Sequence, residues 1–310
     1  MALPNTSVVA VGIEPPLLTG HALEPLTLPI EAPRDALEDL AIELHAGAVA
    51  ILPAARLEPA LRRLHVLQSA LDGRCRIACC QTDLSPLAAG VLAGLAASVA
   101  PYTPSAALLA DALPALEQEL LVAAVLPRVL RLRNPRPRLG ARLRSLLPGA
   151  RFLVSPEPEP IVAPVHWRHK PPILLEDAGE EIAVVHAGRV RGVGAPAQLL
   201  GEVFAGAAVA EVQVPPGLAG RWRTAQAIEA VAYPTDVEAM ARRVFALPAT
   251  TCPWCGEPHA ALPCALCGHD RDRAIASRHV LGRPEADPSV SEFAPGSSGG
   301  PCRSCVGPGR

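Results

Sequence analysis

Four cysteines near the C-terminal end constrain the fold more than any other feature of the sequence. Cys252 and Cys255 form one CxxC pair, Cys264 and Cys267 form a second, and eight residues separate the pairs. Each pair can turn two thiolates toward one metal ion, and four thiolates complete the tetrahedral shell of a structural zinc site. The spacing therefore predicts a closed zinc site, with zinc as the expected cofactor. Two redox dithiols are the weaker alternative.

The other five cysteines fall into two groups. Cys302 and Cys305 form a third CxxC pair, which is interpreted as a mobile dithiol, with half of an intermolecular metal site as the alternative. Cys75, Cys79 and Cys80 lie in an apolar segment that is expected to be a buried strand, where free cysteine behaves as a small hydrophobic residue. Cys80 also comes shortly before an expected helix start, and thiolates are stabilised at helix N-termini. A reactive Cys80 is therefore the alternative for this group.

Composition limits the functions that the chain can have. Half of the residues are apolar but only 3% are aromatic, so Leu, Val, Ile and Ala must build the core. The formal net charge is −2, which leaves no basic footprint for nucleic acid. The N-terminal segment lacks the pattern of a secretory signal, and no apolar run reaches the roughly 18 residues of a membrane-spanning helix. With nine cysteines and no signal, a reducing cytoplasm is the expected compartment.

Composition also divides the chain into three zones. Residues 1–248 are apolar and carry alternating strand and helix signals, which predicts an α/β domain with a largely parallel sheet flanked by helices. Residues 249–275 contain the clustered cysteines and are expected to form a zinc ribbon. Residues 276–310 are rich in Pro, Gly and Ser with few large apolar residues, which predicts a disordered tail.

The periodicity of the first zone predicts the individual elements. Strands are expected at Ser7–Ile13, Ala22–Ile30, Ala48–Leu52, Cys75–Cys80, Phe152–Val154, Ala208–Val214 and Ala227–Ala232. Helices are expected at Ala55–Leu71, Pro196–Phe204 and Val237–Phe245, and they dominate between Pro86 and Leu147. The Ala- and Gly-rich segment that begins at Pro86 is expected to be a buried helix. Glu181–Val193 is expected to be a hairpin that turns at Ala187-Gly188.

The order of these elements resembles the ATP-binding domain of ABC transporters over about residues 7–204. Ala46–Leu64 is similar to the first core strand, phosphate loop and following helix of that family, and Cys79–Leu87 is similar to its Q-loop. Leu146–Pro158 resembles the helix and Walker B strand, and Glu181–Leu200 resembles the strands and helix that close the domain. The resemblance implies an ABC-ATPase-like mixed sheet flanked by helices.

The motifs that bind and hydrolyse ATP are nevertheless missing from the matching positions. A phosphate loop needs glycines and a lysine that reaches the phosphates, but the lysine position falls at about Glu58, and Lys170 is the only lysine of the chain. Pro156 stands where an Asp would hold Mg²⁺, and Glu157 takes the place of the catalytic glutamate without a metal to act on. Of the signature motif only Gly140 remains. The resemblance therefore implies a pseudo-ATPase without catalytic residues.

The resemblance also implies a function and partners. A pseudo-ATPase of this kind would be a non-catalytic subunit of a transport complex, paired with an active ABC ATPase or a membrane permease. It would lie in the cytoplasm, peripherally at the inner face of the membrane. Gln81 takes the glutamine position of the Q-loop, a segment that touches the permease in this family. Gln81, Asp83 and Leu84 are therefore the expected partner interface.

Two functions of other classes remain open. A zinc-ribbon adaptor that binds protein or RNA would be unrelated to transport. A Rossmann-like enzyme would use Cys80 together with Asp83. Three further clusters are interpreted as surface without a site: the basic and aromatic run His166–Lys170, the acidic and proline run Pro156–Pro160, and the arginine-rich segment Arg128–Arg144.

Overall fold

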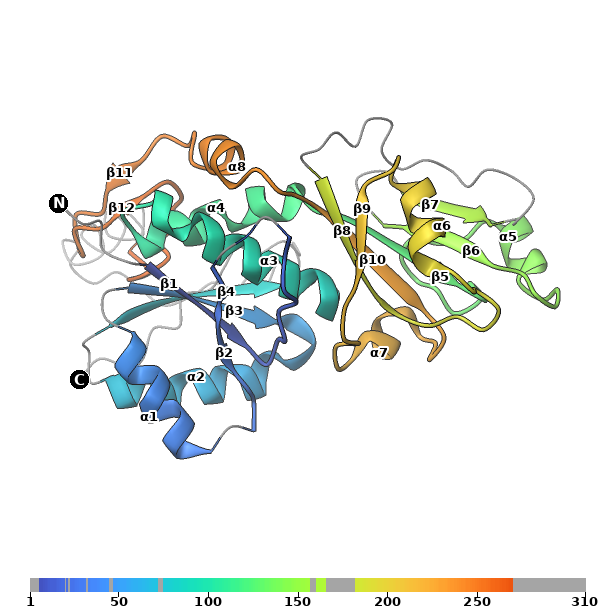
Figure 1. Cartoon of the computed structure of the whole chain (residues 1–310). Helices are drawn as coiled ribbons and strands as arrows, with labels where there is room; N and C mark the ends of the chain where they lie inside the picture. The colour runs from blue at the N-terminus through green and yellow to red at the C-terminus, as the bar shows by residue number, and fades with distance from the viewer. Residues whose placement is uncertain are drawn as a thin grey trace, which may run out of the picture.

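The computed structural model arranges the chain around two separate β-sheets (Figure 1). It describes residues 6–19, 21, 23–31, 33–44, 47–71, 75–156, 160–165 and 182–269. Several predicted features lie outside the described residues, namely the tail at 276–310 with Cys302 and Cys305, the run His166–Lys170, and Glu157. The expected zinc ribbon is described as far as His269.

The first sheet has four parallel strands in the order β2-β1-β3-β4. These strands are Leu26–Leu28 (β2), Thr6–Val11 (β1), Gly47–Pro53 (β3) and Arg76–Thr82 (β4). Their apolar side chains are buried on both faces, as is usual for parallel strands that helices cover on both sides. The covering helices are α1 (Arg34–Glu43) and α2 (Leu57–Leu71) on one face, and α3 (Pro86–Val99) and α4 (Ala106–Gln118) on the other (Figure 1).

The second sheet has six strands in the order β7-β6-β5-β10-β8-β9, and only the β8–β9 pair is parallel. Its strands are Leu121–Leu126 (β5), Phe152–Ser155 (β6), Ile161–Pro164 (β7), Ile182–Gly188 (β8), Ala208–Glu211 (β9) and Ile228–Pro234 (β10). One face packs against α6, and the other packs against α3. The remaining helices are α5 (Leu139–Arg144), α6 (Pro196–Val203), α7 (Leu218–Trp222) and α8 (Val237–Val244).

α3 is the element that joins the two sheets. It contacts β1 and β3 of the first sheet and β10 of the second, and its residues from Leu87 to Val99 are all buried. A helix that is apolar on all sides is stable only when it is covered on all sides. Its small residues permit close packing, since a Cβ on Gly90 would lie 2.8 Å from the carbonyl oxygen of Glu14. The prediction of a buried helix from Pro86 is confirmed.

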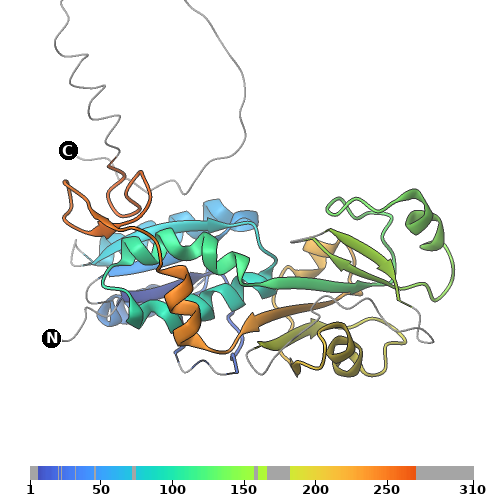
Figure 2. The same ribbon diagram turned by 90° about the horizontal axis from the view of Figure 1, so that it is seen from above.

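After α8 the chain returns to the first sheet and forms a small ribbon. Its two antiparallel strands are Thr250–Thr251 (β11) and Pro258–His259 (β12). β12 packs against α4. Figure 2 shows the ribbon beside the first sheet, at the end of the molecule that lies away from the second sheet.

Most of the expected elements are present, and the differences have local causes. The prediction of a hairpin at Glu181–Val193 is wrong, because β8 is a single strand that ends at Gly188. Gly188 has a φ of 97°, and a Cβ there would collide with the carbonyl oxygen of Ala227, so the chain leaves the sheet at this glycine. The prediction of helices between Pro86 and Leu147 misses β5, because a short continuous apolar run fits a buried helix and a buried strand equally well.

The sheet topology contradicts the ABC-ATPase architecture. In that resemblance β3 precedes the phosphate loop and β6 is the Walker B strand, and both must end at one Mg²⁺-bound nucleotide. The structure instead places β3 in the parallel sheet and β6 in the other sheet, between β5 and β7. The mixed α/β class with flanking helices is confirmed, and the ABC-ATPase-like arrangement is wrong.

Candidate functional site

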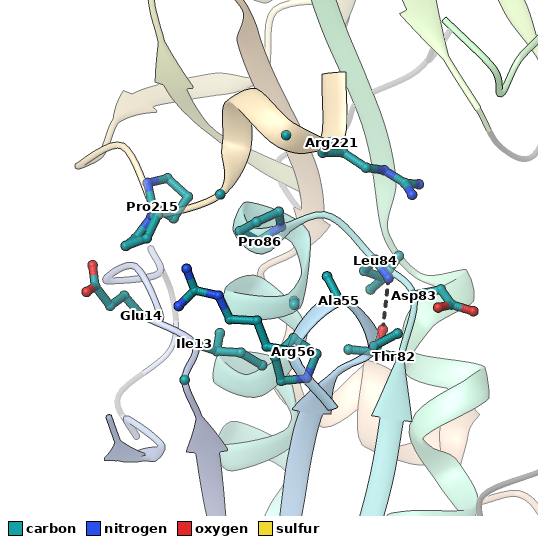
Figure 3. A pocket seen from close by; sticks show the side chains of 17 residues that line it. Ile13, Glu14, Ala55, Arg56, Thr82, Asp83, Leu84, Pro86, Pro215 and Arg221 are labelled. Carbon is teal, nitrogen blue, oxygen red and sulfur yellow. Dashed lines mark hydrogen bonds between the residues drawn. The ribbon is translucent and has the colours of Figure 1, made fainter. Parts of the chain in front are cut away.

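A cleft of about 620 Å³ lies where β1, β3 and β4 end and where α7 faces them (Figure 3). The carboxyl ends of parallel strands are the usual ligand site of open α/β sheets, because the loops of neighbouring strands converge there. The volume is that of a small-molecule pocket. Four segments contribute the lining: 12–14 after β1, 53–56 after β3, residues between 82 and 89 after β4, and residues between 215 and 221 at α7.

The loop after β1 turns into the cleft at a glycine. Gly12 has a φ of 65°, and its N–H donates to the carbonyl oxygen of Leu28 at 2.8 Å. A Cβ on Gly12 would lie 2.6 Å from the side chain of Ile30, so a larger residue would clash as well as adopt an unfavourable conformation. This turn brings Ile13 and Glu14 to the wall of the cleft.

The turn after β4 is held by a threonine. The Thr82 hydroxyl donates to the carboxylate of Glu117 at 2.8 Å. It also accepts the N–H of Leu84 at 3.2 Å, as Figure 3 shows. The hydroxyl is buried, so these two bonds satisfy it without water. They fix the short connection that places Asp83 and Leu84 at the cleft before α3 begins.

A buried carboxyl group ties α7 to the start of α3. The Ser85 hydroxyl and the Trp222 indole N–H both donate to Glu229, whose side chain is fully buried. Burial raises the pKa of Glu229 from 4.5 to about 7, and the hydrogen bonds from Ser85 and Trp222 oppose that rise. Ser85 also caps α3 by accepting the N–H of Ala88. This network positions α7, which carries Arg221 at the cleft.

The cleft is mainly apolar, with charges at defined places. Twelve of its seventeen lining residues are apolar or glycine. The charged residues are Glu14, Arg56, Asp83 and Arg221. Figure 3 shows the Arg56 side chain extending into the cleft toward Pro215, whereas the carboxylates of Glu14 and Asp83 lie toward opposite rims. An apolar hollow that an arginine enters suits a ligand with an apolar body and an anionic group.

The residues of the expected partner interface, and those of the alternative enzyme site, do not lie in one place. Asp83 and Leu84 line the cleft, but Gln81 lines a different cavity of about 50 Å³, together with Cys80. Cys80 is 2% exposed and belongs to the hydrophobic core. Cys80 and Asp83 therefore do not form one reactive site in the cleft.

Three residues of the cleft and its surroundings are not among the sequence predictions. Arg56 and Arg221 belong to no motif in the sequence, and the fold brings them to one cleft. Glu229 does carry a signal, because it is the only charged residue within the apolar run Ile228–Tyr233. A carboxyl group in a buried strand needs hydrogen-bond partners, which marks it for attention.

The four cysteines of the ribbon come together at the other end of β4. The Sγ atoms of Cys252, Cys255, Cys264 and Cys267 all lie within 4.8 Å of one another. Arg76 begins β4 and contacts this ribbon, whereas the last residues of β4 reach the cleft. The cysteine cluster is therefore a candidate metal centre that is distinct from the cleft.

Comparisons with known proteins place the fold near one group of solved structures. No protein-family model matches the chain, and a search of curated proteins gives no match. A DegV family protein of Corynebacterium glutamicum, Cg2579, has 16% identity and a TM-score of 0.44, over 75% of this chain and 97% of its own. A fatty-acid-binding DegV family protein of Thermus thermophilus has 10% identity and a TM-score of 0.46, over 74% and 100%. DegV of Bacillus subtilis, described as a fatty acid binding protein, has 12% identity and a TM-score of 0.41, over 74% and 99%.

The resemblance to ABC ATPases is wrong, because β3 and β6 lie in different sheets, and the solved structures found are DegV family proteins and not ABC ATPase domains. The predicted pseudo-ATPase subunit, paired with an ABC ATPase or a permease, is wrong for the same reason. The expected position at the membrane loses its basis as well. In the described part of the chain, no helix has the length and apolar character to cross a membrane. TM-scores below 0.5 reflect a distant likeness, so a ligand has to be argued from the cleft itself.

Proposed function

We propose that the chain is a binding protein for amphipathic carboxylates such as fatty acids, held in the cleft at the ends of β1, β3 and β4. The observation that carries this proposal is the entry of Arg56 into a mainly apolar hollow, in which the carboxylates of Glu14 and Asp83 lie toward the rims. The ligand's carboxylate would meet the guanidinium, and its alkyl chain would lie on the apolar walls. The Thermus and Bacillus structures are described with the same ligand class, but the support comes from the residues of this cleft.

Arg56 stands where an anion is favoured. It ends the short helix η1 (Ala54–Arg56) and directly precedes α2, which has 15 residues. The dipole at the start of α2 attracts negative charge, although the Leu57 N–H already donates to the Ala54 carbonyl oxygen and Pro59 has no N–H. The nearest carboxylate in the sequence, Glu58, pairs with Arg62 at 3.4 Å instead. The Arg56 guanidinium can bind a ligand carboxylate through two parallel hydrogen bonds.

The walls of the cleft offer the apolar surface that an alkyl chain needs. Ile13 and Leu84 come from the loops of the first sheet, Pro86 and Ala89 from the first turns of α3, and Pro215 from the segment before α7. Each methylene group that leaves water on such a surface contributes about 0.8 kcal/mol, or about fourfold in affinity. Affinity should therefore rise along the series octanoate, decanoate and dodecanoate.

Titration calorimetry of the full chain with dodecanoate and dodecanol tests the proposal. The two ligands share one alkyl chain, so the difference between them reports on the headgroup. Arg56→Gln should weaken dodecanoate binding about 10- to 100-fold, which corresponds to the 1.5–3 kcal/mol of a hydrogen bond to a charged group. Binding of dodecanol should not change. Arg142→Gln on the distant helix α5 removes the same charge and should change neither affinity (Figure 1).

Two results would contradict the proposal. Wild-type affinity of Arg56→Gln for dodecanoate would show that the carboxylate does not lie at Arg56. An affinity that does not rise from octanoate to dodecanoate would show that the cleft does not hold the alkyl chain.

A further inference from the structure

The cysteine cluster has the dimensions of a filled zinc shell. We propose that Cys252, Cys255, Cys264 and Cys267 bind one Zn²⁺, and that this ion keeps the ribbon folded against α4. Zinc–sulfur bonds of about 2.3 Å place the corners of a tetrahedron about 3.8 Å apart. The sulfur atoms of Cys252 and Cys267 lie 3.6 Å apart, and those of Cys255 and Cys264 lie 3.8 Å apart. Both separations match that tetrahedron, and the other sulfur pairs lie within 4.8 Å.

The two CxxC segments are built as matching turns. The Gly256 N–H donates to the carbonyl oxygen of Cys252 at 2.9 Å, and the Gly268 N–H donates to that of Cys264 at 2.8 Å. The two glycines have φ values of 77° and 68°, which residues with a Cβ rarely adopt. In each turn, backbone N–H groups also donate to the sulfur of the first cysteine. The two turns thus share one geometry, with backbone N–H groups directed at the first sulfur of each pair.

The donor set limits the choice of metal and indicates the role of the site. None of the four cysteines is in a disulfide, and their sulfur atoms all lie within 4.8 Å of one another, as the ligands of one metal ion do. Sulfur ligands select zinc or iron over magnesium and calcium. A shell of four protein ligands leaves no position for water or substrate, which makes the site structural.

One carboxylate of α4 anchors the ribbon. The Asp111 Oδ2 atom accepts the N–H of Ala260 at 2.6 Å and the N–H of Ala261 at 2.9 Å. Both N–H groups belong to the loop between the two CxxC turns. The bonds can form only when that loop keeps its shape, and the shape depends on the turns at its two ends.

The sulfur cluster also touches the first sheet and its helix directly. Cys252 and Cys264 are buried against Ala107 of α4, and the Arg76 guanidinium donates to the Cys255 carbonyl oxygen at 3.3 Å. A zinc ion with four thiolates carries two excess negative charges, and Arg76 places a positive charge beside them. The strands of the ribbon have only two residues each, too few for a core of their own, so metal binding would supply the energy that folds it.

Metal analysis of the freshly purified full chain tests the site. We expect one zinc per chain in the wild type and loss of that zinc in Cys264→Ser. Two control variants remove thiols that are not part of the cluster. One is Cys75→Ser, just before β4, and the other is the double variant Cys302→Ser with Cys305→Ser. Both should keep one zinc. Iron in place of zinc, zinc retained in Cys264→Ser, or zinc lost in the Cys302 and Cys305 variant would overturn the assignment.

Hydrogen exchange tests the role of the metal in docking. Removal of zinc with a chelator should raise exchange at Ala260 and Ala261 and leave β1 and β3 protected. Asp111→Asn should keep one zinc per chain but raise exchange at the same two amides. Protection of those amides that survives chelation would show that the ribbon is folded without the ion and would overturn the proposal.

Discussion

Replacement of Glu229 by Gln should remove a defined pH dependence from the stability of the chain. Glu229 is fully buried in β10, and burial raises its pKa from 4.5 to about 7. In the unfolded chain the carboxyl group returns to its ordinary pKa. Between the two values the folded protein keeps a proton that the unfolded chain has released, so the free energy of unfolding falls as the pH rises.

The size of the effect follows from the two pKa values. The stabilising contribution is fully present below the unfolded pKa of 4.5 and is lost as the pH rises through about 7. The whole difference amounts to about 3 kcal/mol, and most of it is lost between about pH 5 and about pH 8. Gln keeps the shape of the protonated side chain. Its carbonyl oxygen can accept from Trp222, and its amide can donate to the Ser85 hydroxyl.

Guanidinium unfolding at several pH values measures the difference. Glu229→Gln should match the wild type near pH 5 and become more stable than it by about 2–3 kcal/mol near pH 8. Glu202→Gln on the exposed surface of α6 removes the same charge and should follow the wild type at every pH. Parallel pH profiles of wild type and Glu229→Gln would refute the reasoning, because they would mean that Glu229 is already ionised near pH 5.

Three further substitutions test the packing and the surface of the fold. Gly90→Ala should destabilise the chain by about 1–3 kcal/mol, because its Cβ would lie 2.8 Å from the Glu14 carbonyl oxygen. Gly201→Ala in α6, with nothing within 4 Å of its Cβ, should stabilise it by about 0.5–1 kcal/mol. If Gly90→Ala and Gly201→Ala shifted the midpoint temperature of thermal unfolding in the same direction, these two predictions would be contradicted. Arg243→Met removes two hydrogen bonds to Glu119, at 3.0 Å and 2.7 Å between partly exposed side chains, and should cost up to about 1 kcal/mol. An unchanged unfolding midpoint would show that the pair contributes nothing.

The elements of this fold are more predictable than the sheets that they form. α3 is identified by its own composition, because an uncharged Ala- and Gly-rich run has no other stable place than a covered helix. β3 and β6 are both short apolar runs, and nothing within either run tells which strands it joins. Sheet membership depends on contacts between residues far apart in the chain. A largely correct order of elements is therefore compatible with a wrong architecture.

The same contrast separates the two candidate sites. The cysteine cluster is predictable because its four cysteines lie close together in the sequence, and two short turns bring the sulfurs together. The cleft has no such local pattern, because Ile13, Arg56 and Leu84 come from three strand ends and Arg221 comes from α7. Each of these residues is unremarkable in its own segment. The parallel alignment of β1, β3 and β4 brings the first three of them to one cleft.

The second sheet is connected to the rest of the chain at only one place in the fold. The second sheet is a topological insertion: the chain leaves the first unit through β5 and returns through β10, and Leu121 lies opposite Ala232 in that antiparallel pair. The flanking helices α4 and α8 both pack with α3 in the first unit. The segment from β5 to β10 therefore leaves and rejoins the rest of the chain at adjacent positions. The whole segment could be exchanged for another at this one place. Such an exchange would replace α7 above the cleft and leave the strand ends beneath it intact.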